Sequence, residues 1–486
     1  MPADGRAATA GRPWRIVLVA LVVLGAVLRI IGARGELCLD EVWTLGQLSL
    51  VTAPLQILVD LANDNNHILT SLWLYAAGGA QASPLWLRTL AIAFGAASVV
   101  AAGAAMHGRG RASVIVAMAL AAVAYPLVHY GSEARGYAGF VLFVLVSIAC
   151  LARELETPDG RSRAILGAAI GLGLLSHLAM APAATVLALW TAWVIFRRTG
   201  RLVATLVRTL AIFAPALMWT LAVATFYAIA WLRHGFEYGN FPFGAIKFID
   251  AYGTLLALMI GIPPQVPPAI VCAAALALVA AAAWRWRGDG DIMNGLYVGA
   301  IIVLPAAMLV ARLPNTEFAR HFLFSAIVFL LFIAELFGRL WEQKGLRRAV
   351  ALALLIACLA GNAASLARFY ASGRGHYVDA ISAMAAEGTF TFASNHDFRN
   401  RMMTEFYGKK LGVAATLIRA GHECDQPPAW WLSDSSQELP DRMVLGGARC
   451  TLTFERRRVY PLWGLSGVRL TLYRRADGEI APSRQR

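Results

Sequence analysis

Several charged and polar residues of this sequence lie just beyond the ends of long apolar stretches. They are Asp40, Glu41, Asp64, His67, Glu133, Arg135, His177, Arg320 and His321. A carboxylate can accept a proton from a hydroxyl group, and guanidinium and imidazole groups can hold a phosphate. Residues of these types, gathered at one surface of a membrane, suit a reaction on the headgroup of a lipid.

The elements that must position these residues are membrane-spanning helices. Of the 486 residues, 58% are hydrophobic and only 15% are charged, and the mean hydropathy is +0.60. A soluble chain carries about a quarter charged residues. We therefore expect a polytopic α-helical membrane protein with about eleven spans. They lie near residues 14–32, 84–106, 113–129, 137–152, 164–178, 180–196, 209–231, 265–284, 292–311, 321–340 and 349–366.

Three of these segments allow more than one interpretation. The first apolar run, residues 14–32, ends without a small-residue cleavage site, so we expect a retained span and not a signal peptide. Residues 164–196 could instead form one long tilted helix. Residues 250–262, just before a cluster of prolines, could form a re-entrant segment.

The distribution of basic residues predicts the orientation. With the N-terminus in the cytoplasm, the inner loops hold eighteen Arg and Lys residues, and the outer side holds eight up to residue 366. The inner ones lie within residues 6–15, 109–111, 153–163, 197–208, 285–287 and 339–348. This asymmetry follows the positive-inside rule, which also accounts for the net charge of +14. Since no nucleic-acid-binding motif is present, we expect no nucleic-acid partner.

Two domains are expected. Residues 1–366 form the membrane domain, whose first extracytoplasmic loop covers residues 33–83. Within this loop, residues 66–81 have the apolar spacing of a helix that lies in the membrane interface. A loop of this length is usually functional.

The second domain is expected in residues 367–486, on the outer face of the membrane. Its apolar runs are too short to span a bilayer. The segments TFTFAS and VRLTLYRR alternate apolar and polar residues, as β-strands do. We therefore expect a small extracytoplasmic α/β domain.

The placement of the polar residues bears on the class of protein. Transporters carry charges near the bilayer midplane, commonly on broken helices. Here the midplane is nearly free of charge, and Glu335 lies near the inner end of its span. This pattern favours an enzyme acting at the outer surface. The alternatives are a transporter or flippase of a lipid-linked sugar, and a structural or regulatory membrane protein.

The motifs resemble those of a known family. ELCLDEVWTL at residues 36–45, NDNNHILTSLWLY at 63–75 and HYGSEARGYA at 129–138 look like segments of the GT-C glycosyltransferases. The similarity is to the protein mannosyltransferase and aminoarabinose transferase type. LLSHLAMAP at 174–182 and EFARHFLFSAIVFLLFIAEL at 317–336 resemble two further segments of that family. The chain has NHIL where the family often has paired prolines.

The resemblance implies an activity. It suggests an inverting glycosyltransferase that moves a sugar from a polyprenyl-phosphate carrier to an acceptor hydroxyl, on the periplasmic face of a bacterial-type inner membrane. The expected partners are the polyprenyl-phosphate-linked sugar, membrane lipid, and an acceptor that could be a protein, a glycan or a lipid. The resemblance implies no definite cofactor, and a divalent cation is compatible with it.

Each candidate residue has an expected role and an alternative. Asp40 is expected to be the general base, and Glu41 to orient a neighbour or to be a solvated loop carboxylate. Glu133 is grouped with them as a catalytic candidate. The alternatives for Asp40 are a helix cap or an ion pair with Arg29, Arg34 or Arg135.

The basic candidates are expected to bind the donor phosphate. Arg135 and Arg320 begin spans, where backbone N–H groups favour an anion, or they snorkel to the interface. His177 and His67 could each donate to phosphate, bind a metal, or be satisfied interfacial histidines. Asp64 and His67 lie beside the expected interfacial helix and are candidates for the acceptor side or for that helix. Their spacing also fits a metal pair.

The six cysteines fall into three groups. Cys150, Cys272 and Cys358 lie in spans, where we expect small apolar fillers. Cys38 lies two residues before Asp40. Cys424 and Cys450 share the second domain in an oxidising compartment, so we expect a disulfide between them.

Overall fold

The computed structural model describes residues 12–61, 63, 65–235, 239, 241–287, 291–386, 390–435, 438–446 and 450–476. It divides into two compact units. The helical unit comprises Met1–Ala33 and Leu50–Ala367, and the sheet unit comprises Arg34–Ser49 and Arg368–Arg486. From the sequence we expected a single boundary, between residues 366 and 367. The division differs in that residues 34–49 of the first loop, which include Asp40 and Glu41, pack with the C-terminal domain.

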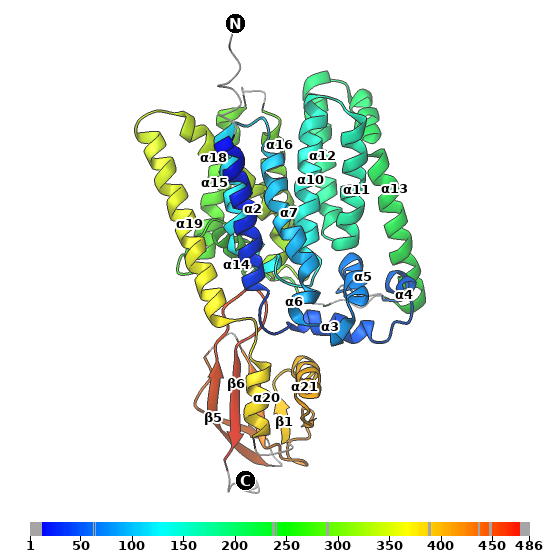
Figure 1. Ribbon diagram of the computed structural model, residues 1–486, viewed down its shortest axis with the longest axis vertical. Coiled ribbons are helices and arrows are strands. Elements are labelled where there is room, and N and C mark those ends of the chain that lie inside the picture. Colours follow the sequence, from blue (N-terminus) through cyan, green and yellow to red (C-terminus); the bar gives the residue numbers. More distant parts are fainter. Residues whose placement is uncertain are drawn as a thin grey trace. The chain divides into compact units, whose positions relative to one another are not determined.

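The helical unit contains the apolar helices (Figure 1). Its long helices are α2 (Arg12–Gly32), α7 (Thr89–Ala105), α8 (Arg111–Val123), α10 (Tyr137–Glu156), α11 (Gly160–Ser176), α12 (Met180–Thr199), α13 (Leu202–His234), α14 (Ala245–Met259), α15 (Pro268–Trp286), α18 (Leu323–Glu342) and α19 (Leu346–Ser372). The shorter ones are α4 (Pro54–Val59), α5 (Ile68–Ala76), η1 (Gly79–Gln81), α6 (Pro84–Leu87), α9 (Tyr125–Tyr130), α16 (Met293–Val298), η2 (Gly299–Val303), α17 (Leu304–Val310) and η3 (Ala319–Phe322).

Eight helical segments of the described chain are long and apolar enough to cross a membrane. They are α2, α10, α12, α13, α15, the continuous α16–η2–α17, η3 with α18, and α19. Three other expected spans coincide with helices α7, α8 and α11, which have 17, 13 and 17 residues. The protein is therefore a polytopic helical membrane protein, and the expected count of eleven is not confirmed.

Residues 164–196 could form either two helices or one long tilted helix. The structure has two helices, α11 and α12, with a break between them that begins at His177. The alternative of one long helix is therefore wrong. The interruption matters because it leaves His177 outside both helices, where its side chain can face a site.

Helix α18 lies at the centre of the helical unit and is apolar on every face. Almost the whole helix is buried, from Leu323 to Gly338 with few exceptions. It packs against α8, α10 and α14. A helix that is hydrophobic all round is normally a buried one, which explains its central place.

Arg29 is a structural residue of the helical unit. Its side chain is buried, and its guanidinium donates hydrogen bonds to the carbonyls of Gly25, Ala121 and Ala122. A Cβ atom at Gly95 would lie 2.3 Å from Arg29 Nε, so α7 can approach the arginine only because it has a glycine there. Backbone carbonyls are the usual partners for a charge inside a bundle.

The sheet unit combines a mixed sheet with three helices (Figure 1). Its elements are α3 (Leu39–Leu48), α20 (Tyr377–Ala385), β1 (Phe390–Ser394), α21 (Asp397–Leu411), β2 (Ala415–Leu417), β3 (Trp430–Asp434), β4 (Arg442–Gly446), β5 (Thr451–Tyr460) and β6 (Leu470–Arg475). The strand order is β2-β1-β3-β6-β5-β4. The β1 strand is parallel to β2 and β3, and the remaining pairs are antiparallel. The expected α/β domain is confirmed, and TFTFAS and VRLTLYRR supply β1 and β6.

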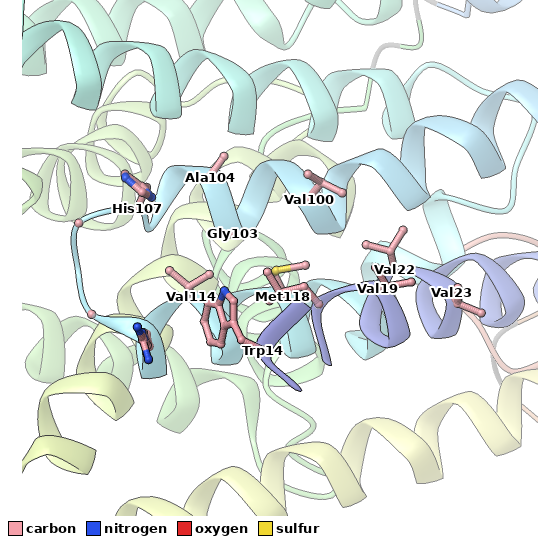
Figure 2. Close-up of a pocket in the computed structure, with 14 residues that line it drawn as sticks. Trp14, Val19, Val22, Val23, Val100, Gly103, Ala104, His107, Val114 and Met118 are labelled. Atoms are coloured by element: carbon pink, nitrogen blue, oxygen red, sulfur yellow. The ribbon is translucent and has the colours of Figure 1, made fainter. Parts of the chain in front are cut away.

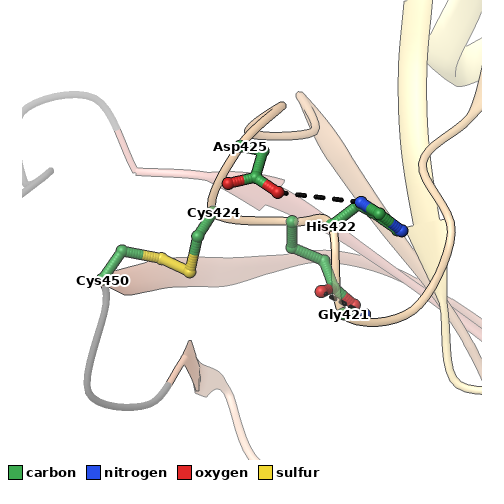
Figure 3. Close-up of a disulfide and its surroundings, with 6 residues drawn as sticks. Gly421, His422, Cys424, Asp425 and Cys450 are labelled. Carbon is green, nitrogen blue, oxygen red and sulfur yellow. Dashed lines mark hydrogen bonds and ion pairs between the residues drawn. A yellow bond between two sulfur atoms is a disulfide. The ribbon is translucent and has the colours of Figure 1, made fainter.

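The core of this unit is aromatic and contains a disulfide. Trp431, Phe454 and Tyr473 are buried in it. Cys424 and Cys450 form a disulfide that joins the loop before β3 to the start of β5 (Figure 3). The bond therefore links two loops 26 residues apart in the sequence.

We predict that Cys450→Ser lowers the free energy of unfolding of the sheet unit. A cross-link over a loop of this length stabilises by about 2–4 kcal/mol, mainly by restricting the unfolded chain. The measurement is resistance to limited proteolysis of the full-length protein in detergent. Recovery of both cysteines as free thiols in non-reducing peptide mapping of the mature protein would contradict the disulfide itself.

Candidate functional site

The turn between α9 and α10 carries a chain of buried charges. The Glu133 carboxylate is fully buried, lies 3.0 Å from His129 Nε2 and lies 3.8 Å from the Arg135 guanidinium. The other ring nitrogen of His129 lies 3.4 Å from the hydroxyl of Tyr125. A buried carboxylate is costly unless it is paired, and these two neighbours supply the pairing. Glu133 is thus placed to hold Arg135.

Arg135 is fixed on a second side by Tyr137. Its guanidinium donates a hydrogen bond of 3.3 Å to the Tyr137 hydroxyl and lies 4.8 Å from the centre of the tyrosine ring. Only 6% of its surface is exposed. An arginine held in this way keeps its orientation and loses little rotamer freedom when it binds an anion.

Two histidines stack beside this tyrosine. The rings of His67 and His177 lie 4.8 Å apart, and the rings of Tyr137 and His177 lie 4.7 Å apart. His67 comes from the start of α5 in the first loop, and His177 from the interruption between α11 and α12. Three segments that are distant in the sequence therefore meet at one place, within the helical unit.

Hydrogen bonding determines the tautomer of His177. The backbone N–H of Ala179 donates to His177 Nδ1 over 3.0 Å, so this nitrogen carries no proton. In a neutral imidazole the proton then lies on Nε2, which becomes a donor. His67 Nε2 is buried and has no hydrogen-bond partner in the described structure. A buried polar atom of this kind is a candidate contact for a ligand.

Both histidines are held neutral. Burial, followed by the neighbouring Arg135, His321 and Arg320, lowers the pKa of His177 to about 3. Burial, with His177, Arg135 and Arg320, also lowers the pKa of His67 well below its usual value. Arg135, His177 and His67 meet around Tyr137. Arg320 acts electrostatically on both histidines. Arg135, Arg320, His177 and His67 are here called the cationic cluster.

Gly136 permits this close packing. A Cβ atom at this position would lie 1.7 Å from the carbonyl oxygen of Ser176 and 2.9 Å from the His67 ring. The first of these atoms belongs to the backbone of α11 and cannot rotate away. The glycine of the motif therefore lets the α9–α10 turn approach both histidine-bearing segments.

We predict that Gly136→Ala disrupts the cationic cluster. The added methyl group must push the turn away from Ser176, which separates Arg135 from His177. The probe is undecaprenyl phosphate, a carrier of the type that the sequence motifs lead us to expect, and we expect its binding by the purified protein to weaken at least tenfold. Gly160→Ala is the matched control, because a Cβ atom there meets nothing within 4 Å. Equal binding by both variants would contradict the packing argument.

A second prediction concerns pH. Since the pKa of His177 lies near 3, the unliganded protein keeps this ring neutral at every pH above about 4. For the glycosyl transfer expected from the motifs, the profile of kcat/KM, which reports the unliganded protein, should therefore show no ionisation of His177 between pH 5 and pH 8. His177→Gln should lower kcat/KM by a similar factor throughout that range. An acidic limb present in the parent protein and lost in His177→Gln would contradict this.

Asp40 and Glu41 of the first loop lie in the sheet unit. Glu41 is buried in the first turn of α3, and its carboxylate accepts a hydrogen bond of 2.8 Å from the backbone N–H of Cys38. It caps the helix, so the alternative of a solvated carboxylate is wrong. Asp40 is half-buried in the same turn, and its backbone carbonyl accepts a hydrogen bond from the Thr44 hydroxyl. A carboxylate in a first turn is favoured by the helix dipole.

The alternative metal pair consists of Asp64 and His67. Asp64 lies outside the described residues. Among the described residues, no group of three or more His, Cys, Asp or Glu side chains is arranged to hold a metal ion. His67 instead stacks on His177.

Two contributors to the site were missed by reasoning from the sequence. Tyr137 contacts Arg135, His67 and His177, and His129 pairs with Glu133. The spacing of His129 and Glu133, four residues apart at the end of a helix, was a usable signal. Tyr137 gave none beyond its place in the motif.

A separate hollow lies elsewhere in the helical unit. It has a volume of about 810 Å³ and lies between α2, α7 and α8, where Val19, Val100 and Met118 line it (Figure 2). Its walls are apolar and include no carboxylate among the lining residues. None of the candidate residues lines it, so it does not belong to the site.

Comparison with known proteins adds a limited likeness. No protein-family model and no curated protein matches the sequence. The archaeal oligosaccharyltransferase AglB from Archaeoglobus fulgidus, solved with an inhibitory peptide and a dolichol-phosphate, is 13% identical, with a TM-score of 0.47, over 87% of this chain and 69% of that chain. ArnT from Cupriavidus metallidurans is 14% identical in its apo state, with a TM-score of 0.41, over 96% of this chain and 98% of that chain.

The undecaprenyl-phosphate-bound structure of the same ArnT gives 14% identity and a TM-score of 0.40, over 95% of this chain and 98% of that chain. These neighbours are GT-C membrane glycosyltransferases, the class that the sequence motifs resemble. At such identities and TM-scores the likeness carries no functional argument, which must come from the residues.

Proposed function

We propose that this protein is an inverting glycosyltransferase that uses a polyprenyl-phosphate-linked monosaccharide. The observation that carries the proposal is the cationic cluster. Arg135 and two neutral histidines meet at the ends of helices in a membrane protein, and Arg320 acts on both histidines. Arg135 and His67 are buried, whereas His177 and Arg320 are half-buried. A group of this composition is suited to a phosphate whose lipid chain enters from the bilayer.

In this proposal the cluster binds the donor phosphate. Arg135, kept in place by Glu133 and Tyr137, supplies a fixed pair of N–H donors. Arg320 adds a second positive charge, and His177 donates through Nε2–H. Glu133 is then a positioning residue, because it acts on the phosphate only through Arg135.

The transfer step needs one further group, a base for the acceptor. The acceptor oxygen attacks the anomeric carbon from the side opposite the phosphate, and the proton of its hydroxyl passes to the Asp40 carboxylate. The bond between the anomeric carbon and the phosphate oxygen breaks, and its electron pair leaves with polyprenyl phosphate. Attack from the opposite side inverts the anomeric configuration. The carrier is already a good leaving group, so an acid is not required at that oxygen.

The proposed location follows from the basic residues of the loops. The N-terminus is cytoplasmic, and the reaction takes place on the periplasmic face of a bacterial-type inner membrane. The acceptor is a hydroxyl group on a protein, a glycan or a lipid. A divalent cation at Asp64 and His67 remains a prediction.

We predict that Asp40→Asn lowers transfer by about a hundredfold or more, the usual effect of losing a general base. The side chain is half-buried at the start of α3 and asparagine keeps its shape, so the fold should remain. The measurement is transfer from a panel of undecaprenyl-phosphate-linked hexoses and pentoses by purified protein, with donor binding followed separately. Asp425→Asn, an exposed carboxylate in a loop of the same unit, is the matched control.

Two outcomes of this experiment distinguish the possible functions. Arg135→Lys should weaken binding of undecaprenyl phosphate, while Asp40→Asn should leave it unchanged. Near-normal transfer by a folded Asp40→Asn protein would remove the assigned base. Tight donor binding with no transfer by the parent protein, but with movement of the donor across vesicles, would instead identify a flippase.

A further inference from the structure

We propose that the C-terminal domain is a positioning element for the catalytic base, and that Glu36, Tyr407 and Phe398 hold the segment that carries Asp40. This inference rests on the proposed function, because it matters to activity only if Asp40 takes part in the transfer. Residues 36–43 are here called the base segment.

The first contact lies before Asp40. The Glu36 carboxylate accepts two hydrogen bonds of 2.8 Å, from the backbone N–H groups of Tyr377 and Val378 at the start of α20. Glu36 thus caps α20 from a distant part of the chain, since the first N–H groups of a helix have no partner within it. A Cβ atom at Gly375 would lie 2.7 Å from this carboxylate, so the glycine makes room for it.

The second contact is made by the next residue, Leu37. The Tyr407 hydroxyl accepts a hydrogen bond of 2.6 Å from the backbone N–H of Leu37 and donates one of 3.3 Å to the carbonyl oxygen of the same residue. One hydroxyl can do both, because it has one proton and two lone pairs. Tyr407 is buried on α21, so these hydrogen bonds fix the position of the Leu37 backbone relative to α21.

The third contact lies after Asp40. The rings of Trp43 and Phe398 meet edge to face at 5.7 Å, and α3 packs against α21. The base segment is therefore held on both sides of Asp40 by two helices of the C-terminal domain. Between these contacts, Glu41 caps α3 internally through the N–H of Cys38.

The base segment needs this support from α20 and α21 to stay ordered. Helix α3 has ten residues, and a helix this short is marginal in isolation. A general base must also stay within about half an ångström of its productive place to work well. The contacts from α20 and α21 supply an order that the short helix lacks, and they give the C-terminal domain a role in the reaction.

The test is Tyr407→Phe in the full-length protein, with Tyr473→Phe as the matched control. The control removes a buried tyrosine hydroxyl of the same domain, which bonds to the carbonyl of Pro440 and does not touch the base segment. The first readout is the rate at which N-ethylmaleimide modifies Cys38, which is only 7% exposed and lies two residues before Asp40. The second readout is kcat and KM for the undecaprenyl-phosphate-linked sugar that supports transfer.

In Tyr407→Phe we expect modification of Cys38 to be about tenfold faster, because the base segment opens more often. We also expect kcat to fall about tenfold or more with an unchanged donor KM, since the donor phosphate is bound in the helical unit. Tyr473→Phe should change neither quantity. Phe398→Leu, which alters a partly exposed ring, should act in the same direction as Tyr407→Phe and covers the case in which that variant fails to fold.

Unchanged modification of Cys38 in both Tyr407→Phe and Phe398→Leu would overturn the inference. So would faster modification with normal kcat. If Asp40→Asn is inactive while Tyr407→Phe transfers normally, the positioning role alone is lost. If Asp40→Asn is active, the proposed function is lost whatever the other variants do.

Discussion

A guanidinium that is more than nine-tenths buried has to be surrounded by groups that pair with it, and the neighbourhood of Arg135 is organised by this requirement. Glu133 lies on one side of it, and the hydroxyl and ring of Tyr137 on the other. Glu133 is in turn held by His129. Each member is buried and already paired, so removing one would leave a charge without compensation in a medium of low dielectric constant. The turn between α9 and α10 therefore has little freedom to rearrange.

This rigidity explains why the histidines can be neutral. His67 and His177 stack beside a fixed positive charge, and burial in that position makes a further proton unfavourable. A protonated pair would repel Arg135 and weaken the packing around Gly136. Because the rings stay neutral, they can sit close together and close to the arginine. The geometry and the electrostatics of the cluster thus depend on each other.

The sequence predicted the fold better than it predicted the site. Long apolar runs mark helices because the bilayer requires about twenty apolar residues, and alternation in TFTFAS and VRLTLYRR marks strands. The span count is not confirmed at α7, α8 and α11, whose helices have only 17, 13 and 17 residues. The pairing of residues 34–49 with the C-terminal domain was not predictable, because it depends on contacts such as Leu37 with Tyr407, 370 residues apart. Periodicity carries no information about such pairs.

For the candidate residues, the sequence predicted the types but not the contacts. Arg135, Arg320 and His177 could be recognised as polar residues at the ends of apolar runs. The residues that they contact could not be predicted. Glu41 looked equally suited to solvent or to a neighbour, and only the structure shows that it caps α3 through Cys38. The tautomer of His177 likewise depends on a hydrogen bond from Ala179, which no spacing rule reveals.

The balance of charge in the cluster bears on the direction of the proposed reaction. A polyprenyl-phosphate sugar is a phosphodiester with one negative charge, whereas the departing polyprenyl phosphate gains a second as the bond breaks. Glu133 offsets the charge of Arg135, so Arg135, Arg320 and Glu133 together carry one net positive charge. This charge attracts the departing dianion more strongly than the monoanionic donor, because Coulomb attraction grows with the charge of the ligand, and only such differential binding accelerates a reaction. A carrier that merely moved the donor would gain nothing from that difference, because its ligand keeps the same charge throughout.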